Sequence, residues 1–344
     1  MPRTGPAPAA RGLRAAWRRR GPLACALLPL SLLYRALLAL HRLPYALGFR
    51  RGGQAGIPVI VVGNVIAGGA GKTPVTLALA RHLRDGGWSP GIVSRGYGRS
   101  TDDCREARPD SAPADVGDEP ALLARASGVP VFVARKRIEA VQALRARHPQ
   151  VDVVISDDGL QHLALARDIE LCVFNDDGIG NGWLLPAGPL REPWPRPVSA
   201  VLHAAATPPA GTPADTPCFG LQRQLAPFAL TRDGQRVPLA GLQGLRLHAL
   251  AAIARPEDFF AMLRAQSLEL AHTEALPDHY NFESWQRSSD LGLQVICTEK
   301  DAVKLWPHVP QALAVPLHLR IAPGYFDLLD ARLCLSSTPL NTNR

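Results

Sequence analysis

The stretch IPVIVVGNVIAGGAGKT, residues 57–73, decides the fold class of this chain. Its first seven residues are almost entirely apolar and rich in β-branched side chains, which is typical of a buried parallel strand. Over residues 73–84 the apolar side chains recur with helical periodicity. A strand and a helix joined by a glycine-rich loop predict an α/β fold that binds phosphate.

The loop itself carries the groups that a nucleotide needs. Lys72 can reach the terminal phosphates, and the Thr73 hydroxyl can bind magnesium. Ile66 stands where the strict G-x-x-x-x-G-K-[ST] pattern has its first glycine, so this is a variant loop. An accidental glycine-rich loop is the alternative, which the GKT ending between strand and helix disfavours. Backbone N–H groups can curl around phosphate oxygens at three positions, Gly68, Gly69 and Gly71.

A second apolar strand is expected at residues 151–156, and it runs into Asp157 and Asp158. Carboxylates at the carboxyl end of a parallel strand beside a phosphate loop are where the magnesium of a nucleotide is held. A solvated turn is the alternative reading of this acidic pair. We expect further strands, and with them a doubly wound, mostly parallel sheet, from the patterns at residues 90–94, 129–133, 169–174 and 200–203.

Composition indicates a folded protein of two lobes, with 344 residues that are 47% hydrophobic. The net charge of +8 is concentrated at one end, because residues 1–51 hold ten Arg and no acid. The rest of the chain has 28 basic and 30 acidic residues and is close to neutral. A basic stripe on the folded body, which nucleic-acid binding requires, is not evident, so we expect no nucleic-acid partner.

The six cysteines are widely scattered and form no CxxC pair, and no His spacing accompanies them that would indicate zinc. We expect them to be small core residues in a reducing compartment.

The amino-terminal segment is apolar over residues 22–34 and, after Arg35, again over residues 36–40. Neither run reaches the roughly 20 apolar residues that cross a bilayer. A signal peptide is an alternative, but no clear small-x-small cleavage site follows. We expect an amphipathic helix in the membrane plane, with its leucines, Trp17 and tyrosines facing lipid and its arginines facing anionic head groups. A helix packed on the protein's own core is the other alternative.

The segment VGDEP, residues 116–120, places two acids between the loop and the second strand. Asp118 can accept the proton of an attacking hydroxyl, and Glu119 can help to hold a metal ion. An acid pair at the start of a helix is the alternative reading. A GTPase is disfavoured, because no N-K-x-D motif is found and the nearest candidate, residues 298–301, has Lys and Asp adjacent.

Seven motifs in order resemble the tetraacyldisaccharide 4'-kinase family of lipid A biosynthesis, and the resemblance extends to about residue 325. The motifs are GNVIAGGAGKTP, SRGYG (residues 94–98), VGDEP, DDGLQH (157–162), LLPAGPLREP (184–193), DHY (278–280) and TEKDAVK (298–304). Ile66 and Ala70 depart from the family, which usually carries small hydroxyl residues there.

The resemblance implies ATP-dependent phosphorylation of the 4'-hydroxyl of an acylated glucosamine disaccharide, with Mg²⁺ as cofactor. It also implies a peripheral protein on the cytoplasmic face of the bacterial inner membrane, with a lipid substrate and an anionic membrane surface as partners. A membrane-tethered P-loop ATPase switch remains the alternative, and neither the acyl-chain preference nor the oligomeric state can be predicted.

The resemblance also implies roles for individual residues. Asp118 acts as the catalytic base with support from His279, and Lys72 assists the transfer. ATP and its phosphates bind at Gly68, Gly69, Ala70, Gly71, Lys72, Thr73 and Arg191. The metal ion is held by Thr73, Glu119, Asp157, Asp158 and Gln161. The lipid substrate is contacted by Tyr97, Asn64 and His162.

We expect five segments. These are a basic, apolar membrane-associated segment (1–51), a P-loop kinase core (52–206), a Pro-rich linker (207–217), a smaller α/β lobe (218–325) and a tail (326–344). The smaller lobe is expected to contribute His279, Lys300 and Asp301 to the site.

Overall fold

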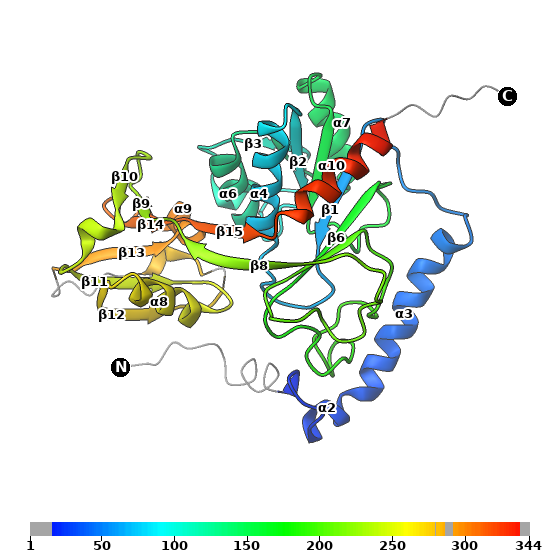
Figure 1. The fold of residues 1–344 in the computed structure, drawn as a ribbon, viewed down its shortest axis with the longest axis horizontal. Helices are drawn as coiled ribbons and strands as arrows, with labels where there is room; N and C mark the ends of the chain where they lie inside the picture. Colours follow the sequence, from blue (N-terminus) through cyan, green and yellow to red (C-terminus); the bar gives the residue numbers. More distant parts are fainter. Residues whose placement is uncertain (1–15, 279, 286–291, 338–344) are drawn as a thin grey trace.

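The structure is a computed structural model that describes residues 16–278, 280–285 and 292–337. Two β-sheets divide the chain into a larger and a smaller lobe (Figure 1). His279, the expected support of the catalytic base, and residues 1–15 of the expected membrane-associated segment lie outside the described residues.

The larger lobe is built on a nine-stranded sheet in the order β15-β8-β7-β6-β1-β5-β2-β4-β3. The seven strands from β8 to β4 run parallel, and β15 and β3 pair antiparallel at the two edges. Their bounds are β1 Val59–Gly63, β2 Pro90–Ser94, β3 Arg105–Ala107, β4 Val131–Val133, β5 Val153–Asp157, β6 Ile169–Phe174, β7 Ala200–His203, β8 Cys218–Leu225 and β15 Leu317–Ile321.

Helices cover both faces of this sheet, so the predicted doubly wound α/β architecture is confirmed. Alternation along β1 sends Ile60 into one core and Val61 into the other. Helices α4 (Lys72–Asp85), α6 (Asp118–Ser127) and α10 (Gly324–Ser337) pack on the first face, and α7 (Arg137–Arg147) packs on the second. A short helix, α5 (Pro113–Val116), precedes α6.

The smaller lobe has a six-stranded sheet in the order β10-β9-β14-β13-β11-β12. Its strands are β9 Phe228–Leu230, β10 Arg236–Pro238, β11 Arg246–Ala251, β12 Glu269–Ala275, β13 Gln294–Thr298 and β14 Leu313–Val315. Two further hydrophobic clusters fill this lobe. Its helices are α8 Pro256–Ala265, α9 Glu299–Leu305 and the 3₁₀ turns η1 Leu239–Leu242 and η2 Phe282–Ser284.

The observed sheets place the lobe boundary later than the expected linker at residues 207–217. These residues join β7 to β8 within the larger sheet, and the chain enters the smaller lobe only after Leu225. It returns through β15, which pairs with β8, so two strands run between the lobes (Figure 1). Much of the expected tail forms α10, whose Tyr325, Leu329 and Leu333 are buried in the larger lobe.

Among the residues from 16 onward that the structure describes, two labelled helices precede β1. They are α2 (Pro22–Ala26) and α3 (Leu28–Ala46), and α3 lies along one side of the larger lobe (Figure 1). Within the described residues, no helix is both long enough and apolar enough to cross a membrane.

Candidate active site

The phosphate loop follows β1 and ends at the first residue of α4. Gly68 has φ 105° and Gly71 has φ 84°, conformations that a side chain would strain. Gly71 is also the N-cap of α4, so the loop delivers its backbone N–H groups to a helix amino terminus. Ala70, within the loop, is buried at 1% exposure and packs in the core cluster that contains Val65 and Ile66.

Lys72 lies in a network of charged and polar groups. Its Nζ is 3.4 Å from Asn64 Oδ1 and 3.7 Å from Asp158 Oδ1. Arg191 Nη1 donates to the same two oxygens, at 3.0 and 3.1 Å. Burial acts to raise the pKa of Asp158, but Lys72 and Arg191 outweigh it and hold that pKa below its usual value. Two cations therefore converge on one carboxylate beside the loop.

Asp157 is the buried member of the acidic pair. Its carboxylate is only 3% exposed and accepts a hydrogen bond of 2.9 Å from Thr76 Oγ1. Burial, followed by the charge of Asp158, raises its pKa to about 6, although Lys72 and the hydrogen bond from Thr76 act to lower it. Arg137 holds the turn by donating to the carbonyl oxygens of both aspartates, at 3.2 and 3.0 Å.

These oxygen-rich groups fit the magnesium ion that the fold implies. Mg²⁺ is usually held by one or two carboxylates together with substrate phosphates and water. Asp157 and Asp158 supply such carboxylates at the end of β5, and the Thr73 hydroxyl belongs to the first turn of α4, the helix that contacts Asp157 through Thr76. Glu119 does not lie close enough to Asp157 and Asp158 for the three carboxylates to form one set of metal ligands among the described residues.

Two glycines bring the motifs SRGYG and VGDEP into contact. A Cβ on Gly96 would lie 2.6 Å from the Val116 carbonyl oxygen, and one on Gly117 would lie 3.0 Å from the Tyr97 carbonyl oxygen. Gly117 is the N-cap of α6, with φ 97°. The turn after β2 therefore sets where α6 begins, and with it the positions of Asp118 and Glu119.

Ion pairs link these two acids to the smaller lobe. Asp118 Oδ2 lies 2.8 Å from Lys304 Nζ, and Glu119 Oε1 lies 3.1 Å from Lys300 Nζ. Burial acts to lower the pKa of Lys300, but Glu119 and then Asp278, 3.4 Å away, outweigh it and raise that pKa. Both lysines lie on α9, four residues apart and so on one helix face.

Lys304 was missed in the sequence analysis, although the motif TEKDAVK and its helical spacing contained the signal. Asp301, by contrast, is expected at the site but is fully buried beneath it. Its Oδ2 accepts from Ala252 N at 3.0 Å and from Thr298 Oγ1 at 2.6 Å, which ties α9 to its own sheet.

The structure places the other expected residues as follows. Asn64 is fully buried and orients Lys72 and Arg191. Gln161 Nε2 donates to the Asn64 carbonyl at 2.9 Å and to Glu192 at 2.5 Å.

His162 follows the aspartate turn along the chain. Its Nε2 accepts a hydrogen bond from the Arg137 backbone N–H at 3.3 Å, and burial, followed by the charge of Arg137, lowers the pKa of His162 to about 4. Tyr97 is 71% exposed.

Helix α3 is attached to the larger lobe through polar side chains. Ser31 Oγ and the Tyr34 hydroxyl donate to carbonyl oxygens of the 184–191 loop at 2.8 and 2.7 Å, and Arg42 pairs with the buried Glu192. Trp17 Nε1 donates to a carbonyl of the same loop at 2.9 Å. The expectation that Trp17 and Tyr34 face lipid is therefore wrong, because their polar atoms satisfy backbone groups of the protein.

The leucines of α3 point away from the protein instead. Six of them are between 48% and 66% exposed, namely Leu30, Leu32, Leu33, Leu37, Leu40 and Leu43, and Leu47, which caps the helix, is 58% exposed. So many exposed leucines on one helix mark an interaction site.

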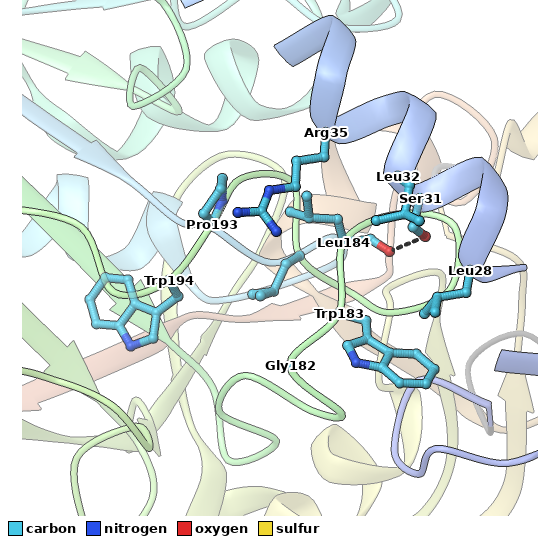
Figure 2. A pocket seen from close by; sticks show the side chains of 10 residues that line it. Leu28, Ser31, Leu32, Arg35, Gly182, Trp183, Leu184, Pro193 and Trp194 are labelled. Carbon is cyan, nitrogen blue, oxygen red and sulfur yellow. Dashed lines mark hydrogen bonds between the residues drawn. The ribbon is translucent and has the colours of Figure 1, made fainter. Parts of the chain in front are cut away.

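A groove of about 360 Å³ lies between α3 and the loop that carries LLPAGPLREP. Leu28 and Leu32 of α3 and the indole rings of Trp183 and Trp194 form its apolar walls, and Arg35 supplies a cation (Figure 2). The same loop continues to Arg191, so the groove and the phosphate loop share one structural element.

A variant phosphate loop, an aspartate pair at the end of the neighbouring strand and a second acidic pair at the start of α6 define a P-loop phosphotransferase. Residues 23–334 match the family model described as tetraacyldisaccharide-1-P 4'-kinase, and the chain belongs to this family.

Relatives agree over nearly the whole chain. The tetraacyldisaccharide 4'-kinase of Delftia acidovorans is 78% identical, over 97% of this chain and 98% of its own length. The tetraacyldisaccharide 4'-kinase of Acidovorax sp. strain JS42 is 63% identical, over 97% of this chain and 97% of its own length. The crystal structure of LpxK from Aquifex aeolicus in complex with ATP superimposes with a TM-score of 0.78 at 26% identity, covering 90% of this chain and 99% of that one.

Proposed function

We propose that this protein transfers the γ-phosphate of ATP to the 4'-hydroxyl of a tetraacylated glucosamine disaccharide 1-phosphate, forming the 4'-phosphorylated lipid A precursor. Family membership supplies the substrate class. The observation that carries the chemistry is the convergence of Lys72 and Arg191 on Asp158 Oδ1 beside the phosphate loop, where the terminal phosphates of a nucleotide would bind. Helix α6 packs against α4, the helix that follows this loop, so its acid pair would act on a hydroxyl directed at the bound nucleotide.

The loop and its cations bind and orient the triphosphate. Backbone N–H groups at the start of α4 hold phosphate oxygens, and Lys72 and Arg191 offset the charge that develops on the transferring group. Bound Mg²⁺ supplies further charge neutralisation, and Thr73, Asp157 and Asp158 are the residues that would hold it. Buried Asn64 keeps both cations aimed at the same place.

Asp118 accepts the proton of the sugar hydroxyl. The hydroxyl oxygen forms a bond to the γ-phosphorus while the bond from that phosphorus to the β,γ-bridging oxygen breaks, and ADP leaves. Lys304, 2.8 Å from Asp118, fixes the direction of this carboxylate. The family resemblance assigns His279 a supporting role beside Asp118, and we keep that assignment as part of the proposal.

The lipid chains are expected along α3. The exposed leucines of this helix fit the acyl region of a bilayer, and the groove lined by Trp183 and Trp194 fits an acyl chain of the substrate. Because α3 is attached through its polar face, lipid contact leaves its docking intact. This arrangement favours peripheral attachment at the cytoplasmic face of the inner membrane, where ATP is supplied.

A membrane-tethered ATPase switch is the competing function, and ATP consumption separates the two. Consumption is measured with the full-length protein in detergent micelles, with and without the acylated disaccharide. The kinase requires the disaccharide and produces one phosphorylated lipid for each ADP. Equal ATP turnover in both conditions, with no phosphorylated lipid, would establish the switch.

A further inference from the structure

Three metal-binding side chains meet on the smaller lobe, in a different lobe from the phosphate loop. Strands β11 and β12 run parallel, with His248 opposite His272 and Leu250 opposite Glu274. Side chains two residues apart on a strand share a face, so both imidazoles and the carboxylate lie on the same side of the sheet. Their ligand atoms all lie within 4.8 Å of one another.

The buried member of this cluster, His248, contacts the carboxylate of Glu274 but forms no well-aligned hydrogen bond through its Nε2. His248 is 2% exposed, and its Nε2 makes no hydrogen bond to the described residues, although Glu274 Oε2 lies 3.2 Å away. A buried polar atom without a hydrogen bond costs free energy. A metal ion between the three side chains would satisfy this nitrogen directly.

The carboxylate of Glu274 already accepts a hydrogen bond of the kind that usually orients a metal ligand. Trp285 Nε1 donates to Glu274 Oε1 at 3.1 Å and leaves Oε2, the oxygen nearest His248, for a cation. Such partners orient a ligand and raise metal affinity. His272 is exposed, so it provides an entry path and can rotate. Tetrahedral zinc ligands lie about 3.3 Å apart, so the three ligand atoms, which lie within 4.8 Å of one another, would draw together when an ion binds.

We propose that His248, His272 and Glu274 bind a divalent transition metal of the zinc class, with a fourth position open to solvent. Two imidazoles and one carboxylate suit zinc, cobalt or nickel, whereas magnesium and calcium require oxygen ligands. The site would not compete with the phosphate loop for Mg²⁺.

A bound ion would also join the edge strand β12 to β11. Glu274 leads along the chain to Asp278, whose carboxylate lies 3.4 Å from Lys300 in the contact with α6. The ion would therefore fix the strand that carries part of the interface between the lobes. The ligands come from two strands separated by α8, which explains why no short sequence spacing reveals them.

Cobalt(II) is the probe, because four-coordinate cobalt absorbs visible light strongly and six-coordinate cobalt does so weakly. The full-length protein is titrated with CoCl₂ in excess Mg²⁺, and the bands are competed with ZnCl₂. His272→Ala and Glu274→Gln should abolish the bands. Both avoid the fully buried His248, so their folding can be verified by thermal unfolding.

Trp285→Phe provides a graded variant, since losing a supporting hydrogen bond weakens metal affinity by about 10- to 100-fold. His148→Ala is the matched control, because His148 pairs with Glu106 at 2.8 Å and the described chain offers no third ligand there. It should bind cobalt like the wild type. Unchanged bands in His272→Ala and Glu274→Gln, or no bands in the wild type at millimolar cobalt(II), would overturn the proposal.

Discussion

Lys72 and Arg191 place two positive charges on one small set of oxygens. They converge on Asn64 Oδ1 and Asp158 Oδ1 over distances of 3.0 to 3.7 Å. Lys72 was predictable because the GKT ending fixes its place at the start of a helix. The position of Arg191 beside it depends on a long connection folding back onto the loop, and only the family resemblance anticipated that.

Lys304 lies where the two lobes meet at the proposed base. We expect Lys304→Met to lower kcat roughly tenfold, the effect of about 1.4 kcal/mol, because Asp118 loses the charge that orients it. In an Asp118→Asn background the same change should have little further effect. Lys136→Met serves as the control, since Lys136 is 70% exposed and pairs only locally with Glu139 among the described residues. Steady-state kinetics that give multiplied penalties, or a faster Lys304→Met enzyme, would contradict this role.

His162 gives the fold a defined pH dependence. Its pKa is lowered from the usual 6.5 to about 4, first by burial and then by Arg137. As the pH falls below 6.5 the unfolded chain takes up a proton that the folded protein resists, so the stabilisation present above pH 6.5 is lost toward pH 4. His162→Gln should therefore show a smaller fall in Tm between about pH 7 and pH 5 than the wild type. The exposed His308→Gln should retain the wild-type fall, and an identical fall in all three proteins would refute the assignment.

At the scale of elements, the start of α6 depends on one glycine. Gly117 has φ 97° and ψ 156°, a region that is essentially restricted to glycine, and a Cβ there would meet backbone atoms of Gly96 and Tyr97 at 3.0 Å. Gly117→Ala should lower the free energy of unfolding by about 1–3 kcal/mol and should also reduce kcat, since Asp118 follows directly. Gly241→Ala, where a Cβ meets nothing within 4 Å, is the matched control. Denaturant unfolding that shows equal stabilities would contradict the constraint.

Helix α3 presents leucines outward without depending on them for its attachment. Replacing Leu33, Leu37 and Leu40, which are 57–66% exposed, with Glu should sharply reduce co-sedimentation with anionic vesicles and leave Tm nearly unchanged. Leu245→Glu, at a site 48% exposed on the smaller lobe, is the control and should sediment like the wild type. Undiminished sedimentation of the triple variant would show that attachment lies elsewhere.

Local sequence patterns predicted where strands begin and end better than they predicted which distant residues contact one another. The strands at β2, β6 and β7 match the expected ranges residue for residue, because each is a short apolar run bounded by loops. The hydrogen bonds from Trp17 and Tyr34 to the protein were not predictable, since their acceptors are carbonyl groups in a loop far along the chain. The sequence of α3 alone does not determine which face of the helix contacts the protein and which face contacts lipid.

At the scale of the whole molecule, β8 and β15 join the two lobes as an antiparallel pair at the edge of the larger sheet. Sequence reasoning assigned both strands to the smaller lobe, because local alternation does not reveal which sheet accepts a strand. The consequence is functional, since Lys300 and Lys304 of the smaller lobe reach Glu119 and Asp118 of the larger one. The proposed site thus requires both lobes.

The most direct measurement is phosphoryl transfer to the lipid in the wild type and in Asp118→Asn. ATP labelled on the γ-phosphate is incubated with the acylated disaccharide 1-phosphate, and phosphorus NMR of the lipid product locates the new phosphate. We expect a monoester at the 4'-position, and a kcat lower by roughly 10²- to 10⁴-fold in Asp118→Asn while ATP still binds. A wild-type protein that leaves the lipid unlabelled, or an Asp118→Asn variant that transfers phosphate at the wild-type rate, would contradict the account.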